Sequence, residues 1–209
     1  MKQHHTVKSK EFVKLIELAL LIAIMLLMET TGLGMIKTAA LEITLLLVPV
    51  IIGAIVLGPI GGTILGAVFG FISFWECFGK SPFGSMLMSI NPFYTFLVCV
   101  PTRTLMGLLC GLIFRGMERI AVKKNLHFIS YVVAALSGAL LNTAFFMSVL
   151  CLCFYHTEYI QGFVSALGSP NVFLFVLAFV GVNGLVEGVV CATIGSSVAQ
   201  AVRSALRVS

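Results

Sequence analysis

Long apolar runs separated by short polar breaks dominate the sequence. Runs of helix length favour a bundle of membrane-spanning helices over a membrane β-barrel, whose strands would alternate between apolar and polar residues. Glycine, proline and charged residues divide the chain into six predicted spans: residues 12–35, 43–57, 61–77, 93–115, 128–154 and 171–199. The second and third are short and joined only by Gly58-Pro59-Ile60, which predicts a tight helical hairpin or one broken element.

Composition supports the same interpretation. Hydrophobic residues make up 59% of the chain and charged residues only 10%, and the mean hydropathy is +1.11. A water-soluble domain of this length would carry far more charge. We therefore expect residues 1–209 to form a single all-α integral membrane domain with six transmembrane helices and no soluble domain.

The basic residues predict the orientation of this bundle. Ten of the thirteen fall in three places that six spans bring to one side: Lys2, Lys8, Lys10 and Lys14; Arg115, Arg119, Lys123 and Lys124; Arg203 and Arg207. The positive-inside rule makes that side cytoplasmic and predicts that both termini lie there. Because these residues lie at segment ends and not in a patch with aromatic residues, we expect no nucleic-acid partner.

Polar side chains at membrane depth are the candidate site. At 1.5 Å per residue, Arg103 lies roughly 15 Å below the outer end of its span, and Asn142 and Asn183 lie roughly 18 Å below theirs. Glu187 follows Asn183 by one turn on the same helix face. Buried ionisable groups in membranes usually face a cavity or a partner, so these four residues predict a common site.

The residue types indicate the ligand. A guanidinium donates in a bidentate pattern to a carboxylate, while amides both donate and accept, so Arg103 with two asparagines suits a carboxylate with neighbouring hydroxyl or amide groups. Pro101 would loosen the helix and free carbonyls toward the same cavity. The alternative is an internal ion pair between Arg103 and Glu187 that only fixes the bundle. The role of Glu187, as a ligand contact or as the partner of Arg103, stays open.

A second polar group lies near the outer surface. Trp75 closes the third span, and Asn91 belongs to a glycine- and proline-rich outer loop. We include Trp75 and Asn91 among the candidate substrate-binding residues, although an aromatic residue at this level is also typical of an interfacial anchor. The loop from Glu29 to Glu42 is either a lid over the outer mouth or a plain connector.

Signatures of catalysis and of metal binding are missing. The sequence has no aspartate, no phosphate-binding glycine loop with its lysine, no H-E-x-x-H pair and no G-x-S-x-G turn. The six cysteines fall in or beside apolar runs without metal-ligand spacing, which favours packing. We expect no enzyme activity, no cofactor, no metal site and no ATP hydrolysis by this chain.

Small residues recur at helix-packing spacing. Glycines 58, 62, 66 and 70 are four residues apart, and Gly107/Gly111 and Gly184/Gly188 are further pairs, which predicts close helix contacts. Ala19 and Ala23 form another such pair, suited either to internal packing or to an outward docking face.

These features resemble the substrate-binding S components of energy-coupling factor (ECF) vitamin transporters. The resemblance rests on the Ala19-x-x-x-Ala23 pair, on Val48-Pro-Val-Ile-Ile-Gly-Ala-Ile-Val-Leu-Gly-Pro59 and the glycines after it, on Phe69-Gly-Phe-Ile-Ser-Phe-Trp75, and on the region from Asn91-Pro92 to Arg103. The second half looks most like the pantothenate-specific members.

The resemblance implies a six-helix substrate-binding subunit of a multi-pass cell-membrane importer. It implies that the loop between the first two spans closes over a vitamin, and that Ala19 and Ala23 dock onto a T component carrying two ATPase subunits. Pantothenate suits Arg103, Asn142 and Asn183. Other members take pyridoxine, riboflavin, folate, thiamine or biotin, and a non-transporting structural membrane subunit is the alternative from another class.

Overall fold

The computed structural model describes residues 2–32, 34–37, 42–124, 127–168 and 171–208, except for the side chains of residues 2–10, 35–37, 42–43, 121–124, 127, 182–183 and 206–208. Within these ranges the chain is helical apart from one short antiparallel hairpin. The elements in order are α1 (Lys2–Thr30), β1 (Met35–Lys37), β2 (Glu42–Thr44), α2 (Leu47–Val56), α3 (Pro59–Glu76), α4 (Pro82–Ile90), α5 (Pro92–Lys124), α6 (His127–Phe154), α7 (Glu158–Ala166), α8 (Val172–Val190), η1 (Cys191–Gly195) and α9 (Ser196–Val208).

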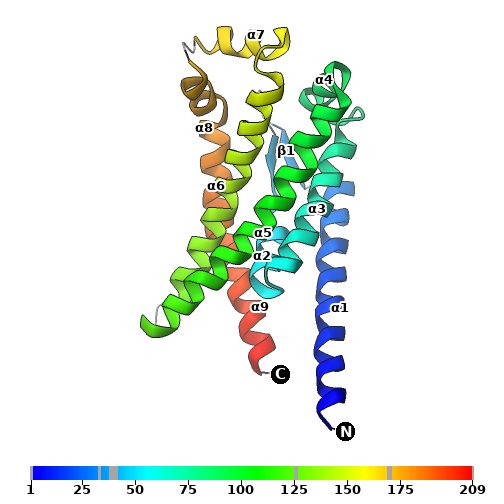
Figure 1. Cartoon of the computed structure of the whole chain (residues 1–209), viewed down its shortest axis with the longest axis vertical. Coiled ribbons are helices and arrows are strands. Elements are labelled where there is room, and N and C mark those ends of the chain that lie inside the picture. The colour runs from blue at the N-terminus through cyan, green and yellow to red at the C-terminus, as the bar shows by residue number, and fades with distance from the viewer. Residues whose placement is uncertain (1, 33, 38–41, 125–126, 169–170, 209) are drawn as a thin grey trace.

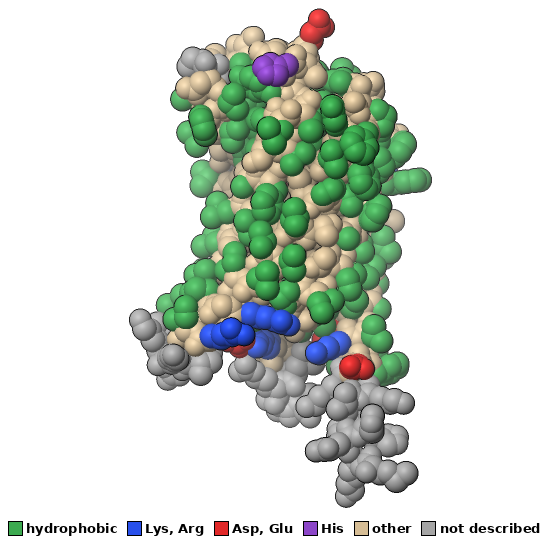
Figure 2. Space-filling view, in the orientation of Figure 1, with side chains coloured by type: hydrophobic (Ala, Val, Ile, Leu, Met, Phe, Trp, Pro, Cys, Tyr) green, Lys and Arg blue, Asp and Glu red, His purple; other side chains and the backbone are tan. Residues whose placement is uncertain are grey.

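Figure 1 shows an elongated bundle in which both termini lie at one end, together with the end of α5 and the start of α6. The short helices α4 and α7 lie at the opposite end, and the hairpin lies in that half of the bundle. In Figure 2, Lys and Arg side chains gather in a band near the end that carries the termini, while the rest of this face is largely apolar. The sequence predicted this grouping of the basic residues on one side.

Four helical segments in the described part are long and apolar enough to cross a membrane: Pro59–Glu76, Pro92–Ile120, Phe128–Phe154 and Gly184–Ala205. The last predicted span, residues 171–199, comprises α8, the π-helical turn η1 and the start of α9, which continues to Val208. The predicted span at residues 43–57 is too long, because residues 42–44 belong to β2. Helix α2 has ten residues, about 15 Å of rise, and is too short to cross a bilayer alone.

Helices α2 and α3 form the predicted tight hairpin. Gly58 joins them with a positive φ of 83°, which glycine adopts without strain, and Pro59 begins α3. A Cβ at Gly53 would lie 2.0 Å from Leu65 Cδ1, so the two helices lie against each other. Nearly all of α2 is buried, which explains why its sequence is apolar on every side.

The glycines of α3 meet α5 at backbone contact. A Cβ at Gly62 would lie 2.3 Å from the carbonyl oxygen of Gly107, and a Cβ at Gly66 would lie 2.3 Å from that of Arg103. The predicted close packing is confirmed for this pair of helices. At Gly188, by contrast, an added Cβ would meet nothing within 4 Å, so the pair Gly184/Gly188 does not form such a contact.

Three elements were not predicted. Helix α4 occupies part of the outer segment taken as a loop, where the Ser81 hydroxyl accepts a hydrogen bond from the Gly84 N–H at 3.2 Å. Helix α7 begins after Thr157, whose hydroxyl accepts from the Ile160 N–H at 3.5 Å. The segment from Glu29 to Glu42, expected to be a lid or a connector, contains β1 and the first residue of β2, which form a hairpin with Met35 paired to Thr44. Each of these elements is too short to leave a strong periodic signal.

Candidate functional site

A small polar cavity lies in the half of the bundle that carries α4 and α7. Its volume is about 80 Å³, and its walls come from β2, α3, α4, α5, α6 and the turn before α4. The polar residues on its lining are Thr44, Ser73, Glu76, Ser81 and Arg103, together with Cys77 and Cys99. Apolar residues from α4 and α6, among them Leu87 and Phe146, complete it.

Arg103 is buried, with 8% of its surface exposed. Its Nη1 donates to the carbonyl oxygens of Val98 at 3.3 Å and Cys99 at 3.2 Å, in the preceding turn of α5. The side chain therefore turns back along its own helix toward the N-terminal end of α5, the direction that helical side chains favour. It does not face lipid.

Two aromatic rings hold the guanidinium in place. Arg103 Cζ lies 4.7 Å from the centre of the Phe69 ring on α3 and 5.5 Å from that of Phe146 on α6. Such contacts stabilise a desolvated cation. Its Nε–H is buried without a hydrogen-bond partner among the described residues. Since buried polar groups are nearly always paired, this donor is available to an acceptor that enters the cavity.

Glu187 and Asn142 lie next to this site. Glu187 Oε1 accepts a hydrogen bond from the Thr44 N–H at 3.1 Å, and Glu187 has the Arg103 charge and the Asn142 amide as further neighbours. The Asn142 Oδ1 atom is buried without a partner. Glu187 and Arg103, both described, make no direct ion pair, so the structure gives Glu187 a contact that the sequence did not predict: it anchors β2 to α8.

The other predicted site residues are Asn183, Trp75 and Asn91. Asn183 is on α8, but its side chain falls outside the described residues. Trp75 is 67% exposed, packs against Phe78, and does not line the cavity. Asn91 caps α5, because its Oδ1 accepts from the Tyr94 N–H at 3.1 Å. Neither Trp75 nor Asn91 is brought together with Arg103.

Several cavity residues were not among the predicted site residues. Ser73, Glu76 and Cys77 line the cavity from one face of α3, and Glu76 is only 4% exposed. Their spacing of three and four residues was a usable signal, since such positions share a helix face. Thr44 could not be found this way, because its place depends on the hairpin.

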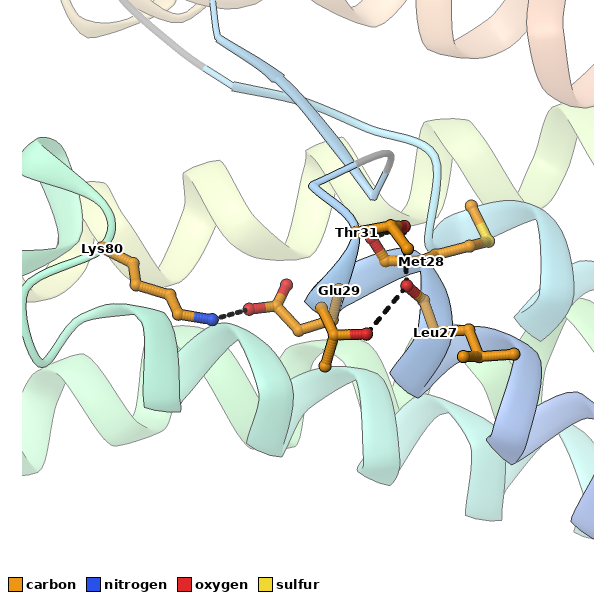
Figure 3. A network of polar contacts seen from close by, with 6 residues as sticks. Leu27, Met28, Glu29, Thr31 and Lys80 are labelled. Atoms are coloured by element: carbon orange, nitrogen blue, oxygen red, sulfur yellow. Dashed lines mark hydrogen bonds and ion pairs between the residues drawn. The ribbon is translucent and has the colours of Figure 1, made fainter.

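An ion pair ties the end of α1 to the turn after α3. Lys80 Nζ lies 2.6 Å from Glu29 Oε1, as Figure 3 shows. The hydrogen bond to Glu29 and the charge of that carboxylate raise the pKa of Lys80, so the lysine stays protonated at neutral pH. The Glu76 carboxyl is a neighbour of both Glu29 and Lys80, which connects this ion pair to the cavity wall.

The side chains of Ala19 and Ala23 lie on the exposed surface of α1. Large apolar residues flank them on the same helix, including Leu20, which is 60% exposed, and Leu27, which is 62% exposed. The small-residue pair therefore does not pack against the described part of this chain, and the docking face stays a prediction.

Among the described residues, no three histidine, cysteine or acidic side chains are placed to hold a metal ion. Comparison with known proteins gives one family: the model described as "ECF transporter, substrate-specific component" matches residues 13–198. No curated protein matches the chain.

Proposed function

Because the chain belongs to the family of ECF transporter substrate-specific components, we propose that it captures a small anionic vitamin, pantothenate, on the outer side of the cell membrane. Members of this family are membrane transport subunits, not enzymes. They bind a small-molecule substrate and work with a T component and ATPases.

Arg103 carries the proposal. Its guanidinium is buried in the cavity, held between two aromatic rings, and its Nε–H has no partner. A carboxylate is the acceptor that such a group binds most strongly. The partnerless Oδ1 of Asn142 would accept a hydrogen bond from a hydroxyl or amide of the same ligand, and Asn183 stays a candidate on α8.

The cavity has to widen to admit a vitamin. One water molecule needs roughly 10–15 Å³, so about 80 Å³ holds only a few waters. The hairpin is the wall best placed to move, because Thr44 lines the cavity and, in the described part of the chain, a hydrogen bond to Glu187 links it to α8. In this proposal the loop from Glu29 to Glu42 and β2 form the lid, and Glu187 holds it closed.

A titration tests the function. Purified protein should bind pantothenate more tightly than pyridoxine, riboflavin or folate, measured by isothermal titration calorimetry in detergent. Preference for one of the other vitamins would contradict the assigned substrate while leaving the family assignment intact. No binding of any of them would support a non-transporting structural subunit.

Glu187→Ala should speed the dissociation of pantothenate by about tenfold, because β2 loses its acceptor on α8 and a hydrogen bond to a charged group contributes roughly 1.5–3 kcal/mol. Glu187→Gln is the matched control, since its side-chain oxygen still accepts from Thr44. Dissociation rates from a filter assay with labelled pantothenate measure the effect. Equally fast dissociation from both variants would mean that the charge of Glu187, and not its hydrogen bond to the hairpin, slows the release of pantothenate.

Replacing Ala19 and Ala23 together by tryptophan should abolish assembly with the T component, because bulky side chains prevent the close helix approach that small residues allow. Pantothenate affinity should stay unchanged, since both alanines lie on the surface of α1. Co-purification with a tagged T component measures assembly. Ala144→Trp on α6, also at an exposed alanine, is the control. Normal assembly of the double variant would refute the docking face.

A further inference from the structure

Two cysteines face each other in the wall of the cavity. Cys77, at the end of α3, and Cys99, on α5, have their sulfur atoms 3.9 Å apart. Both side chains are buried, with 5% and 4% of their surface exposed, and both line the cavity beside Arg103. The six cysteines are free thiols in the structure, and the packing role predicted for them does not explain why these two share a polar wall.

Helices α3 and α5 are in backbone contact beside Cys99. A Cβ at Gly70 would lie 2.9 Å from the carbonyl oxygen of Cys99, and Cys77 lies seven residues, about two turns, further along α3. Helical side chains tilt toward the N-terminal end of their helix. Because the two helices run in opposite directions, Cys77 leans toward the inner end and Cys99 toward the outer end, and this brings the sulfurs together.

The surroundings of the sulfurs are polar. Cys77 Sγ lies 3.3 Å from the Ser73 carbonyl oxygen, and Cys99 Sγ lies 4.0 Å from the Ser73 hydroxyl. The Arg103 guanidinium is an electrostatic neighbour of both thiols. The Glu76 carboxyl is a further neighbour of Cys77. Reactive cysteines occur beside cationic groups with access to water, whereas cysteines in apolar cores are inert. Cys110, fully buried in the main core and 3.3 Å from the Ala134 carbonyl oxygen, illustrates the second class.

We propose that Cys77 and Cys99 form a modification site at which a peroxide converts the two thiols into a disulfide that bridges α3 and α5. A disulfide needs its sulfurs about 2.05 Å apart, so closing the 3.9 Å gap takes a shift of about 2 Å, which the turn that ends α3 at Cys77 has to supply. Hydrogen peroxide is close to water in size and fits a cavity of about 80 Å³.

The reaction balances in two steps. One thiol, as the thiolate, attacks the peroxide, the O–O bond breaks, and a sulfenic acid and one water form. The second thiol then attacks the sulfenic sulfur, the S–O bond breaks, and the disulfide and a second water form. Two thiols lose two electrons and two protons, and one peroxide is reduced to two waters. A reducing thiol reverses the bridge by exchange.

The bridge would also act on substrate binding, a consequence that rests on the proposed function. It ties the end of α3 to α5 across the cavity beside Arg103, so the walls cannot move apart to admit a vitamin. We expect the oxidised protein to bind pantothenate about tenfold more weakly than the reduced protein, equivalent to about 1.4 kcal/mol.

Peptide mapping tests the bridge without any ligand. Trypsin cuts after Lys80 and after Arg103, which places Cys77 and Cys99 in separate peptides with one cysteine each. After treatment of the purified protein with hydrogen peroxide and alkylation of remaining thiols, mass spectrometry should show these two peptides joined, and dithiothreitol should release them. Both cysteines fully alkylated, or either one bridged to a different cysteine, would overturn the proposal.

Variants sharpen this result. In Cys77→Ser, Cys99 should stop at the sulfenic acid, which dimedone traps, and no bridge should form. Cys153→Ser, at a partly exposed cysteine on α6 away from the cavity, should bridge Cys77 to Cys99 like the unaltered protein. A titration of the reduced and the oxidised protein with pantothenate then measures how the disulfide changes the affinity. Failure of the reduced protein to bind pantothenate contradicts the proposed function, whereas a missing bridge contradicts only this inference.

Discussion

Arg103→Ala should weaken pantothenate binding by about a hundredfold, measured by calorimetric titration of the purified protein. The loss of a charge-assisted pair costs roughly 1.5–3 kcal/mol, and every 1.4 kcal/mol is about a factor of ten in affinity. The pantothenate affinity of Arg103→Lys should fall between those of the unaltered protein and Arg103→Ala, because lysine keeps the charge but not the planar fork.

Arg203→Ala is the matched control for this change. Arg203 is also partly buried, contacts an aromatic ring (Phe114, 4.8 Å to the ring centre) and pairs with Glu118 at 2.7 Å, but it joins α9 to α5 away from the cavity. The Arg203→Ala variant should bind pantothenate with the affinity of the unaltered protein. Full affinity in Arg103→Ala would reject the site, and thermal unfolding without ligand shows whether the variant is folded.

Gly107→Val should destabilise the bundle by about 3 kcal/mol or more. A Cβ at Gly107 would lie 2.0 Å from the carbonyl oxygen of Gly62, and backbone atoms of a packed helix cannot move aside as a flexible side chain does. Overpacking of this kind typically costs roughly 1–3 kcal/mol even where side chains can adjust. Because Arg103 is one turn away on α5, the separation of the helices should also lower pantothenate affinity.

Gly116→Val tests the same helix without the contact. Among the described residues an added Cβ at Gly116 meets nothing within 4 Å, and replacing glycine by valine in a helix interior gains roughly a few tenths of a kcal/mol, so this variant should be at least as stable as the unaltered protein. Unfolding by denaturant in mixed micelles compares the stability of Gly107→Val with that of Gly116→Val. Equal stability of both variants would contradict the backbone contact between α3 and α5.

The long helices α3, α5 and α6 and the buried position of Arg103 could be predicted from the sequence because their signals are local. Long apolar runs gave α3, α5 and α6 to within a few residues except at the end of α5, which continues from the predicted residue 115 to Lys124 because its charged last turns extend the helix beyond the apolar run. Glycine spacing predicted the contact between α3 and α5. The depth of Arg103 predicted a buried cation, and it is buried.

The remaining parts of the site depend on contacts between distant segments. Thr44 reaches Glu187 across 143 residues, a contact that no local pattern encodes, and this is why the sequence offered only a ligand or Arg103 as the partner of Glu187. Trp75 was chosen for its depth near the outer surface, but depth does not say which way a side chain points, and it points outward.

The central claim is that the buried guanidinium of Arg103 recognises the carboxylate of the substrate. The most direct test titrates the unaltered protein with pantothenate and with panthenol, which has an alcohol in place of the carboxylate and is otherwise the same molecule. We expect panthenol to bind about a hundredfold more weakly, consistent with roughly 1.5–3 kcal/mol for a charged hydrogen bond. Equal affinity for the two compounds would contradict the account.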